Sequence, residues 1–127
     1  MDPISDMFIR IKNAQRAGHE TVQFPYSKYK HEIAKALERK GYIGGVERKG
    51  KRIKKTLELV LQYREGDPLM HDVRLISKPS RRLYMSYKEL QVSPRGGVLF
   101  VSTPKGVLAS DEARKEKVGG ELIAEIW

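Results

Sequence analysis

The sequence predicts an α+β protein of two small domains, an N-terminal α/β domain with two helices on a small sheet and a C-terminal domain that is mostly β with one helix. Two helix-spaced apolar patterns fall within residues 1–41, whereas short runs bounded by Gly, Pro or Ser fill most of the second half. Residues 65–71, between them, have the polar, Gly- and Pro-containing character of a linker. We therefore expect domains at 1–64 and 72–127.

The first helix is predicted between Asp2 and Gly18. Asp2 is a suitable N-cap, Pro3 is tolerated in a first turn, and Gly18 supplies a stop. The apolar residues at helical spacing are Ile4, Met7, Phe8 and Ile11. Residues 21–24 then form a candidate strand that Pro25 interrupts.

A second helix is predicted from a Ser27 cap to a Gly41 terminator. Its inward positions are Tyr29, Ile33, Ala34 and Leu37. A hairpin follows, with a short strand at 42–46 that two glycines interrupt and a return strand at 56–61. Leucines alternate along the return strand, which predicts that one of its faces is buried.

The turn of this hairpin, residues 48–55, is strongly basic. Its bases are Arg48, Lys49, Lys51, Arg52, Lys54 and Lys55. Such a run fits either a solvated turn or a finger that binds phosphates. The sequence leaves both interpretations open.

The second half is predicted to be mainly β. Short runs at 73–77, 83–86, 98–102 and 121–127 have the bounding residues typical of strands. One helix interrupts them, with Ser110 as its cap. Acids fall in its first turn and bases later, which is the order that the helix dipole favours.

The charge of the chain points to a polyanion as its partner. The 127 residues include 25 Lys and Arg against 16 Asp and Glu, for a net charge of +9 and a pI near 9.8. Such a balance attracts nucleic acid or an acidic membrane surface. Residues 1–64 hold 15 of the bases and 7 of the acids, and a basic belt at 78–106 precedes an acidic closing segment at 111–127.

The sequence argues against an enzyme. Without cysteine there is no disulfide scaffold, thiolate nucleophile or cysteine zinc site. His19, His31 and His71 lack metal-ligand spacing. No nucleophile elbow, P-loop or dinucleotide fingerprint appears. We therefore expect no metal, no cofactor and no small-molecule substrate.

Two other classes of protein could also carry this positive charge, a DNA-binding regulator and a membrane-surface protein. A DNA-binding regulator would need a recognition helix, and Arg10, Asn13 and Gln15 offer base-reading groups but no helix-turn-helix spacing follows them. A membrane-surface protein would need a large apolar face backed by lysine, and the first helix has only a modest stripe. No apolar run reaches the roughly 18–20 residues of a membrane span. The acidic start is unlike a signal peptide, so we expect no membrane partner.

Residues 97–106 run from an apolar strand into a hydroxyl-rich turn. Ser102 and Thr103 offer donors and acceptors, Lys105 offers a cation, and Gly106 permits close backbone approach. Such groups suit an unpaired base edge beside a phosphate, although a Ser-Thr-Pro turn that merely caps a strand has the same composition. The nearby rings on which bases could stack are Tyr84 and Tyr87, flanked by Arg81, Arg82 and Lys88.

The stretch from Gly97 to Ala113 resembles the signature segment of a known family, bacterial-type ribosomal protein eight of the small subunit. Blocks at 2–14, 77–84 and 118–127 resemble that family's first helix, central segment and closing strand. Four blocks in the right order extend the likeness over nearly the whole chain.

The resemblance implies a two-domain protein of the small ribosomal subunit, located in the ribosomes of the cytoplasm, in a bacterium or an organelle. It implies binding to the central domain of small-subunit ribosomal RNA early in assembly, beside neighbouring small-subunit proteins. Members commonly also repress translation of their own operon's messenger RNA, which makes that messenger a further expected partner.

The family's RNA-contacting positions carry over onto this chain, and the sequence departs from the family pattern at Pro104, Phe100, Ser80 and Arg81. They match Ser102, Thr103, Lys105, Gly106, Tyr84 and Glu121. Pro104 stands where members commonly have a second serine, which removes one hydroxyl contact and stiffens the loop. The remaining RNA-binding residues we expect are Tyr87, Lys78, Arg81 and Arg82 in the second half, and Arg10, Asn13, Lys28 and Lys30 in the first. The first half would hold RNA backbone while the second reads shape and unpaired bases.

Overall fold

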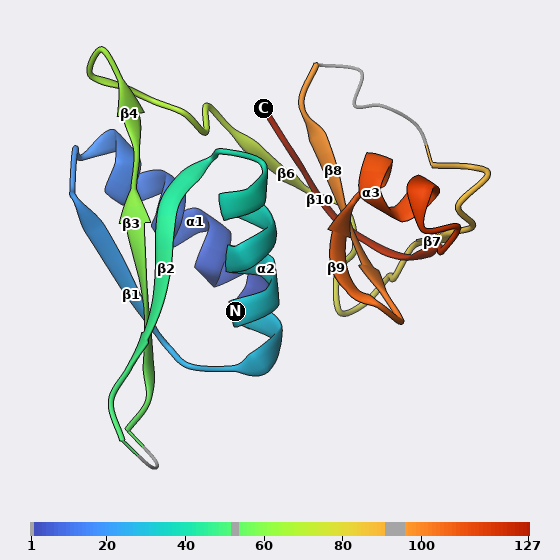
Figure 1. Ribbon diagram of the computed structural model, residues 1–127, viewed down its shortest axis with the longest axis horizontal. Helices are drawn as coiled ribbons and strands as arrows, with labels where there is room; N and C mark the ends of the chain where they lie inside the picture. The colour runs from blue at the N-terminus through green and yellow to red at the C-terminus, as the bar shows by residue number, and fades with distance from the viewer. Residues whose placement is uncertain (1, 52–53, 91–95) are drawn as a thin grey trace. The chain divides into compact units, whose positions relative to one another are not determined.

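The computed structural model describes residues 2–51, 54–90 and 96–127. Within them helices accompany antiparallel sheets, which confirms the predicted α+β class (Figure 1). The chain divides into two compact units, Pro3–His71 and Asp72–Trp127. None of the helices in the described ranges is long and apolar enough to cross a bilayer.

The first unit packs two helices on one face of a three-stranded antiparallel sheet (Figure 1). Its elements are α1 (Pro3–Arg16), β1 (Thr21–Pro25), α2 (Lys28–Arg39), β2 (Ile43–Lys49) and β3 (Thr56–Leu61). β3 is the central strand. Leu57 and Leu59 are fully buried on its helix side, whereas Glu58 and Val60 alternate with them on the open side.

The start of α2 and the ends of α1 and α2 follow the predicted residues. The Ser27 hydroxyl accepts a hydrogen bond from the Lys30 N–H at 3.1 Å and caps α2. Gly18 and Gly41 follow the two helices in the left-handed region, with φ of 75° and 81°. Most of the predicted apolar positions are buried, as Ile11 illustrates with no exposed surface, whereas Ile4 and Tyr29 are only partly buried.

The first strand of the basic hairpin is longer than predicted. β2 continues to Lys49, so Arg48 and Lys49 are strand residues rather than turn residues. The glycines do not break the strand, because a register shift between Ile43 and Gly45 absorbs the irregularity as a bulge. Arg52 of the predicted basic turn lies outside the described residues.

The segment 65–71, predicted to be a linker, contains regular structure. Strand β5 (Asp67–Pro68) pairs with β4 (Tyr63–Arg64) in a small ladder. Met70 is 2% exposed. A polar, Gly- and Pro-containing segment can therefore fold back on itself, because those residues also favour tight turns.

The second unit is a five-stranded antiparallel sheet with one helix (Figure 1). Its elements are β6 (Val73–Leu75), β7 (Tyr84–Met85), β8 (Val98–Thr103), β9 (Gly106–Ala109), α3 (Ser110–Lys115) and β10 (Gly120–Ile126). The strand order is β6-β10-β8-β9, and β7 also pairs with β10. A buried cluster of Leu90, Val101, Ala113 and Leu122 joins the sheet to α3.

In this unit one strand was not predicted and one predicted cap is wrong. Strand β9 has no counterpart among the predicted strands; it pairs along β8, and its Val107 and Ala109 are buried. Ser110 is the first residue of α3 and is buried, so it is not the cap. Ala109 occupies the N-cap position, and the Glu112 side chain accepts a hydrogen bond from its N–H at 2.8 Å. A carboxylate in the first turn thus satisfies the N–H of the N-cap residue, which is a different hydrogen bond from the one predicted for the serine.

Gly120 lies where a side chain would collide with the neighbouring strand. A Cβ there would be 1.9 Å from the Ser102 carbonyl oxygen. We expect Gly120→Ala to push β8 away from β10 and to lower the free energy of unfolding by about 1–3 kcal/mol, the usual cost of overpacking. Chemical denaturation followed by the fluorescence of Trp127, the only tryptophan, measures this loss.

The control is Gly44→Ala, because a Cβ on Gly44 would meet no atom nearer than 3.5 Å. We expect this variant to keep the parent's denaturation midpoint. Equal midpoints for the two variants would contradict the clash.

Candidate nucleic-acid interface

Three of the predicted site residues form a row across the sheet of the second unit. Glu121 on β10 lies opposite Tyr84 on β7 and opposite Ser102 on β8. Directly opposed residues of antiparallel strands project to the same face, so the three side chains are neighbours. The Tyr84 side is open, since that residue is 67% exposed. The row offers an aromatic ring, a carboxylate and a hydroxyl side by side.

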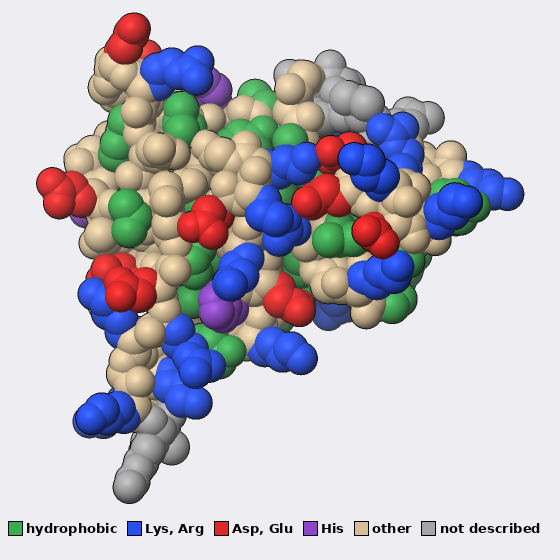
Figure 2. Space-filling view, viewed as in Figure 1, with side chains coloured by type: hydrophobic (Ala, Val, Ile, Leu, Met, Phe, Trp, Pro, Cys, Tyr) green, Lys and Arg blue, Asp and Glu red, His purple; other side chains and the backbone are tan. Residues whose placement is uncertain are grey.

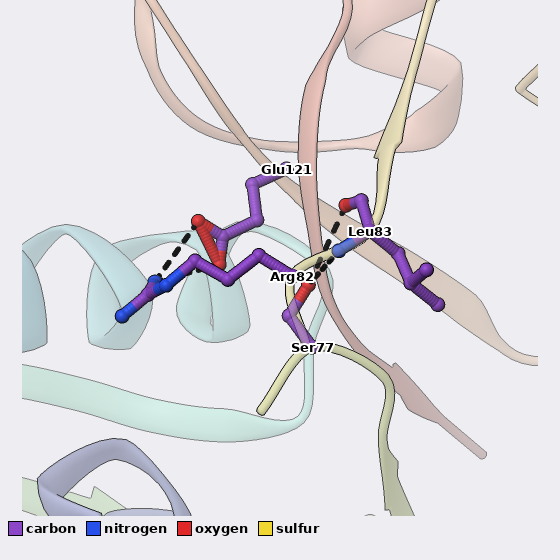
Figure 3. A network of polar contacts seen from close by, with 4 residues as sticks. All are labelled: Ser77, Arg82, Leu83 and Glu121. Carbon is purple, nitrogen blue, oxygen red and sulfur yellow. Dashed lines mark hydrogen bonds and ion pairs between the residues drawn. The ribbon is translucent and has the colours of Figure 1, made fainter. Parts of the chain in front are cut away.

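The carboxylate of this row is paired with a predicted RNA-binding arginine. Arg82 Nη1 donates to both Glu121 carboxylate oxygens, at 3.0 and 3.1 Å (Figure 3). The Arg82 side chain is 56% exposed and that of Glu121 is 16% exposed. An acid on a surface that is expected to bind an anion is therefore partly neutralised by its neighbour. Both residues were predicted from the sequence, but their pairing was not, because they are far apart in the chain.

The loop before β7 is held by Ser77, a residue that was not among the predicted site residues. The Ser77 hydroxyl accepts from the Leu83 N–H at 3.0 Å and donates to the Leu83 carbonyl at 3.4 Å (Figure 3). Within the loop, Lys78 and Arg81 exchange two backbone hydrogen bonds of 2.9 Å. These bonds fix a tight turn whose Lys78 and Arg81 side chains are exposed. A serine six residues before a hydrogen-bonded leucine leaves no recognisable signal in a sequence.

The predicted loop 102–106 is the turn between β8 and β9. Thr103 pairs with Gly106, which leaves Pro104 and Lys105 at the corner, both exposed. The Thr103 hydroxyl donates to the Gly106 carbonyl at 2.7 Å and accepts from the Lys105 N–H at 3.1 Å. The hydrogen of the Thr103 hydroxyl is therefore used in a bond within the turn, and this hydroxyl stabilises the conformation of the turn.

Ser102 differs from Thr103 in having an available hydroxyl. No described residue forms a hydrogen bond with the Ser102 side chain, which is partly exposed at the end of the row. Lys105 carries the nearest cation of the turn, and its ammonium lies 3.0 Å from a Glu116 carboxylate oxygen. Both of these side chains are about half exposed, so this pair contributes little to stability.

The structure separates Tyr87 from the row. Tyr87 packs against the buried cluster that contains Val101 and Leu122. Leu122 follows Glu121 along β10, and successive strand residues point to opposite faces. Tyr87 therefore lies on the α3 side of the sheet, where its ring is partly buried.

In the first unit, Arg10 is engaged by its own surroundings. Its guanidinium lies 4.8 Å from the centroid of the Phe24 ring and donates to the Gln23 carbonyl at 2.9 Å. An Asp6 carboxylate oxygen is 3.9 Å away. Arg10 thus covers the buried Phe24 and ties α1 to β1. Asn13 is exposed farther along α1.

The basic hairpin contains one cation that is already paired. Lys49 projects from the open face of the sheet, 3.0 Å from a Glu58 carboxylate oxygen and 3.9 Å from one of Glu47. The hydrogen bond with Glu58 raises the pKa of Lys49 and lowers the pKa of Glu58, to which Gln23 also donates at 2.7 Å. Lys51 and Lys54 are exposed at the described part of the tip.

The other predicted cations of this unit lie at the start of α2. Lys28 and Lys30 are in its first turn, and Lys28 is exposed. Across residues 2–51, 54–90 and 96–127, no three His, Cys, Asp or Glu side chains are grouped so that they could hold a metal ion. The candidate interface consists of two parts: the row and the turns at 78–81 and 103–106 in the second unit, and separate cations in the first unit.

Comparisons with known proteins identify the family. The chain matches the family described as Ribosomal protein S8 over residues 2–127. Similar proteins named "Small ribosomal subunit protein uS8" occur in Thermus thermophilus, with 47% identity over 99% of this chain and 98% of the relative, and in Dictyoglomus thermophilum, with 43% identity over 99% and 97%. A third, from Erythrobacter litoralis, is 42% identical over 99% of this chain and 97% of its own length. This chain therefore belongs to the ribosomal protein S8 family.

Proposed function

We propose that this chain binds the central domain of small-subunit ribosomal RNA early in assembly, through the row Tyr84–Glu121–Ser102 and the turn Thr103–Gly106. As a member of its family it is a structural protein of the small ribosomal subunit and not an enzyme. The observation that carries the proposal is the register of β7, β10 and β8, which gathers one ring, one carboxylate and one free hydroxyl on a single face.

These groups suit an irregular RNA helix better than a regular duplex. An exposed tyrosine ring can stack on an unpaired base, and a hydroxyl can donate to or accept from a base edge. Glu121, held by Arg82, accepts from an exocyclic amino group with its remaining lone pairs. Lys78, Arg81 and Lys105 would contact the phosphates on either side, which positions the protein without reading sequence.

The first unit would hold a second length of RNA backbone. Lys28 and Lys30 lie near the start of α2, where they oppose the helix dipole, and a phosphate would relieve that repulsion. Lys51 and Lys54 would contact RNA phosphates at the hairpin tip. Arg10 and Asn13 are the weaker members of the proposed set, since Arg10 is engaged within the unit. The proposal includes two domains, residues 1–64 and residues 72–127.

Two further partners belong to the proposal. Neighbouring small-subunit proteins would cover surface that RNA leaves free. A messenger element that presents the same irregular helix would compete for the same row of residues, and repression of the chain's own operon would follow from that competition. Competition between a central-domain ribosomal RNA fragment and duplex DNA of equal length tests the main proposal. Equal affinity for both would overturn it.

Ser102→Ala is expected to reduce discrimination between RNAs. It removes the free hydroxyl of the row, and a lost base contact costs roughly 1–3 kcal/mol, or about 5- to 150-fold in relative affinity. The measurement is the ratio of dissociation constants for the ribosomal RNA fragment and a fully paired RNA. The control is Ser86→Ala, because the Ser86 hydroxyl is bonded to Glu89 at 3.0 Å outside the row. An unchanged ratio in Ser102→Ala would remove the hydroxyl from the reading surface.

Loss of the hairpin-tip lysines is expected to reduce the salt dependence of binding. Each phosphate contact contributes roughly 0.7–0.9 to the slope of log affinity against log salt concentration. The double variant Lys51→Ala/Lys54→Ala should therefore flatten that slope by up to about 1.8 while the preference between RNAs persists. Lys49→Ala should change the slope less, since Glu58 already pairs with that ammonium. An identical slope in the double variant and the parent would mean that the tip is only solvated.

A further inference from the structure

A stack of three side chains lies beside the start of α2 and belongs to none of the sites described above. The guanidinium carbon of Arg48 is 5.2 Å from the centroid of the Tyr26 ring. The His31 ring meets the same tyrosine edge to face, with ring centroids 5.7 Å apart and an interplanar angle of 69°. The three residues come from the end of β2, the segment before α2, and the first turns of α2.

Backbone contacts hold this stack in place. The Tyr26 N–H donates to the Lys55 carbonyl at 3.0 Å, which ties the segment before α2 to the end of the hairpin. The His31 N–H donates to the Ser27 carbonyl at 3.0 Å, and the Ser27 side chain caps the helix. The tyrosine is thus fixed on one side by the sheet and on the other by the helix, so that its ring gives the arginine a defined support.

The Arg48 guanidinium has no acidic or carbonyl partner among the described residues. It stacks on a ring as Arg10 does, but Arg10 also donates to a carbonyl and lies near a carboxylate. Lys49, the next residue of β2, projects to the other face and is paired with Glu58. Arg48 is exposed, so its N–H groups face water in a planar, supported arrangement.

The electrostatic surroundings of the stack are positive. Burial lowers the pKa of His31 from its usual value, and the positive charges of Lys35 and Arg48 lower it further, against a smaller opposing effect of Glu32. Figure 2 shows Lys and Arg side chains gathered over the start of α2 and the basic hairpin. Lys28 and Lys30 precede His31 on the same helix. A dianionic or polyanionic ligand would be attracted to this place.

We propose that Arg48, supported by Tyr26 and flanked by His31, is a preorganised binding site for one phosphate of the RNA backbone. The planar fork of a guanidinium matches two phosphate oxygens, and the ring holds the fork in one orientation before the RNA arrives. The site deepens the proposed function, because it names one specific phosphate contact for the first unit where the general proposal names only separate surface residues. It also assigns a role to Tyr26 and His31.

The test separates charge from geometry. Arg48→Lys keeps the charge but removes the fork, and Tyr26→Leu keeps the arginine but removes its support. We expect each variant to weaken binding of the central-domain ribosomal RNA fragment about tenfold at constant salt. The fold-loss of affinity in the double variant should be smaller than the product of the two single fold-losses, because the arginine and the ring act together. Arg16→Lys is the matched control, since Arg16 is an exposed arginine at the far end of α1 and should bind as the parent does.

Two outcomes are distinguishable. If the parent prefers the ribosomal RNA fragment over duplex DNA but Arg48→Lys and Tyr26→Leu bind it as Arg16→Lys does, the phosphate site is overturned and the proposed function stands. If the parent shows no preference at all, the proposed function fails. Circular dichroism spectra that match the parent establish that each variant is folded, and Tyr26→Phe, which keeps the ring, should restore most of the affinity lost in Tyr26→Leu.

His31 makes the same site dependent on pH. In the free protein its lowered pKa means that the folded state binds fewer protons than the unfolded state just below pH 6.5, so stability falls as the pH falls through that window. The negative charge of a bound phosphate stabilises the protonated form of His31 and offsets the repulsion from Lys35 and Arg48. RNA affinity should therefore rise as the pH is lowered from 7.5 to about 5.5, and His31→Gln should reduce that rise. Parallel profiles for the two proteins would exclude a phosphate beside His31.

Discussion

Strand β10 is the element on which the second unit depends. It pairs with β8 along one edge and with both β6 and β7 along the other, so these three strands would lose their common partner without it. At Gly120 the strand passes so close to the Ser102 carbonyl that no side chain fits. The next residue, Glu121, then lies between β7 and β8 and completes the row with Tyr84 and Ser102. The backbone approach that requires a glycine is therefore the same one that brings the candidate binding groups together.

The sequence was most informative where local chemistry determines local structure. The cap of α2 and the glycines that follow α1 and α2 act within a few residues, and the alternating leucines of β3 indicate which face of the strand is buried. β9 was missed because four residues between a turn and a helix are too few to show a strand period, and they become a strand only by pairing with β8. β2 was predicted too short because a run of bases looks like a turn, although alternate strand positions can place charges on a solvent face.

The candidate interface was predictable as a set of residues but not as an arrangement. Motif resemblance pointed to Glu121 and Tyr84, yet only the register shows that they are neighbours. The same limit applies to Arg82, whose bond to Glu121 joins residues 39 positions apart. Tyr87 looked equivalent to Tyr84 in the sequence, and its burial against the α3 side follows from tertiary packing. Hydrogen bonds likewise distinguish Ser102 from Thr103, which a sequence presents as two adjacent hydroxyls.

Ion pairs with carboxylates determine which cations of this highly basic chain are available to bind a polyanion. Lys49 and Arg48 are adjacent in the sequence and carry the same charge, but strand alternation sends one to Glu58 and the other to the Tyr26 ring. A cation with a carboxylate partner must give up that interaction before it can bind a phosphate, whereas a ring only orients the guanidinium and leaves its donors free. Net charge therefore overstates the binding capacity of this surface. In the proposed binding mode, the free and supported cations would hold the RNA backbone, and the nearly neutral row of the second unit would select the RNA.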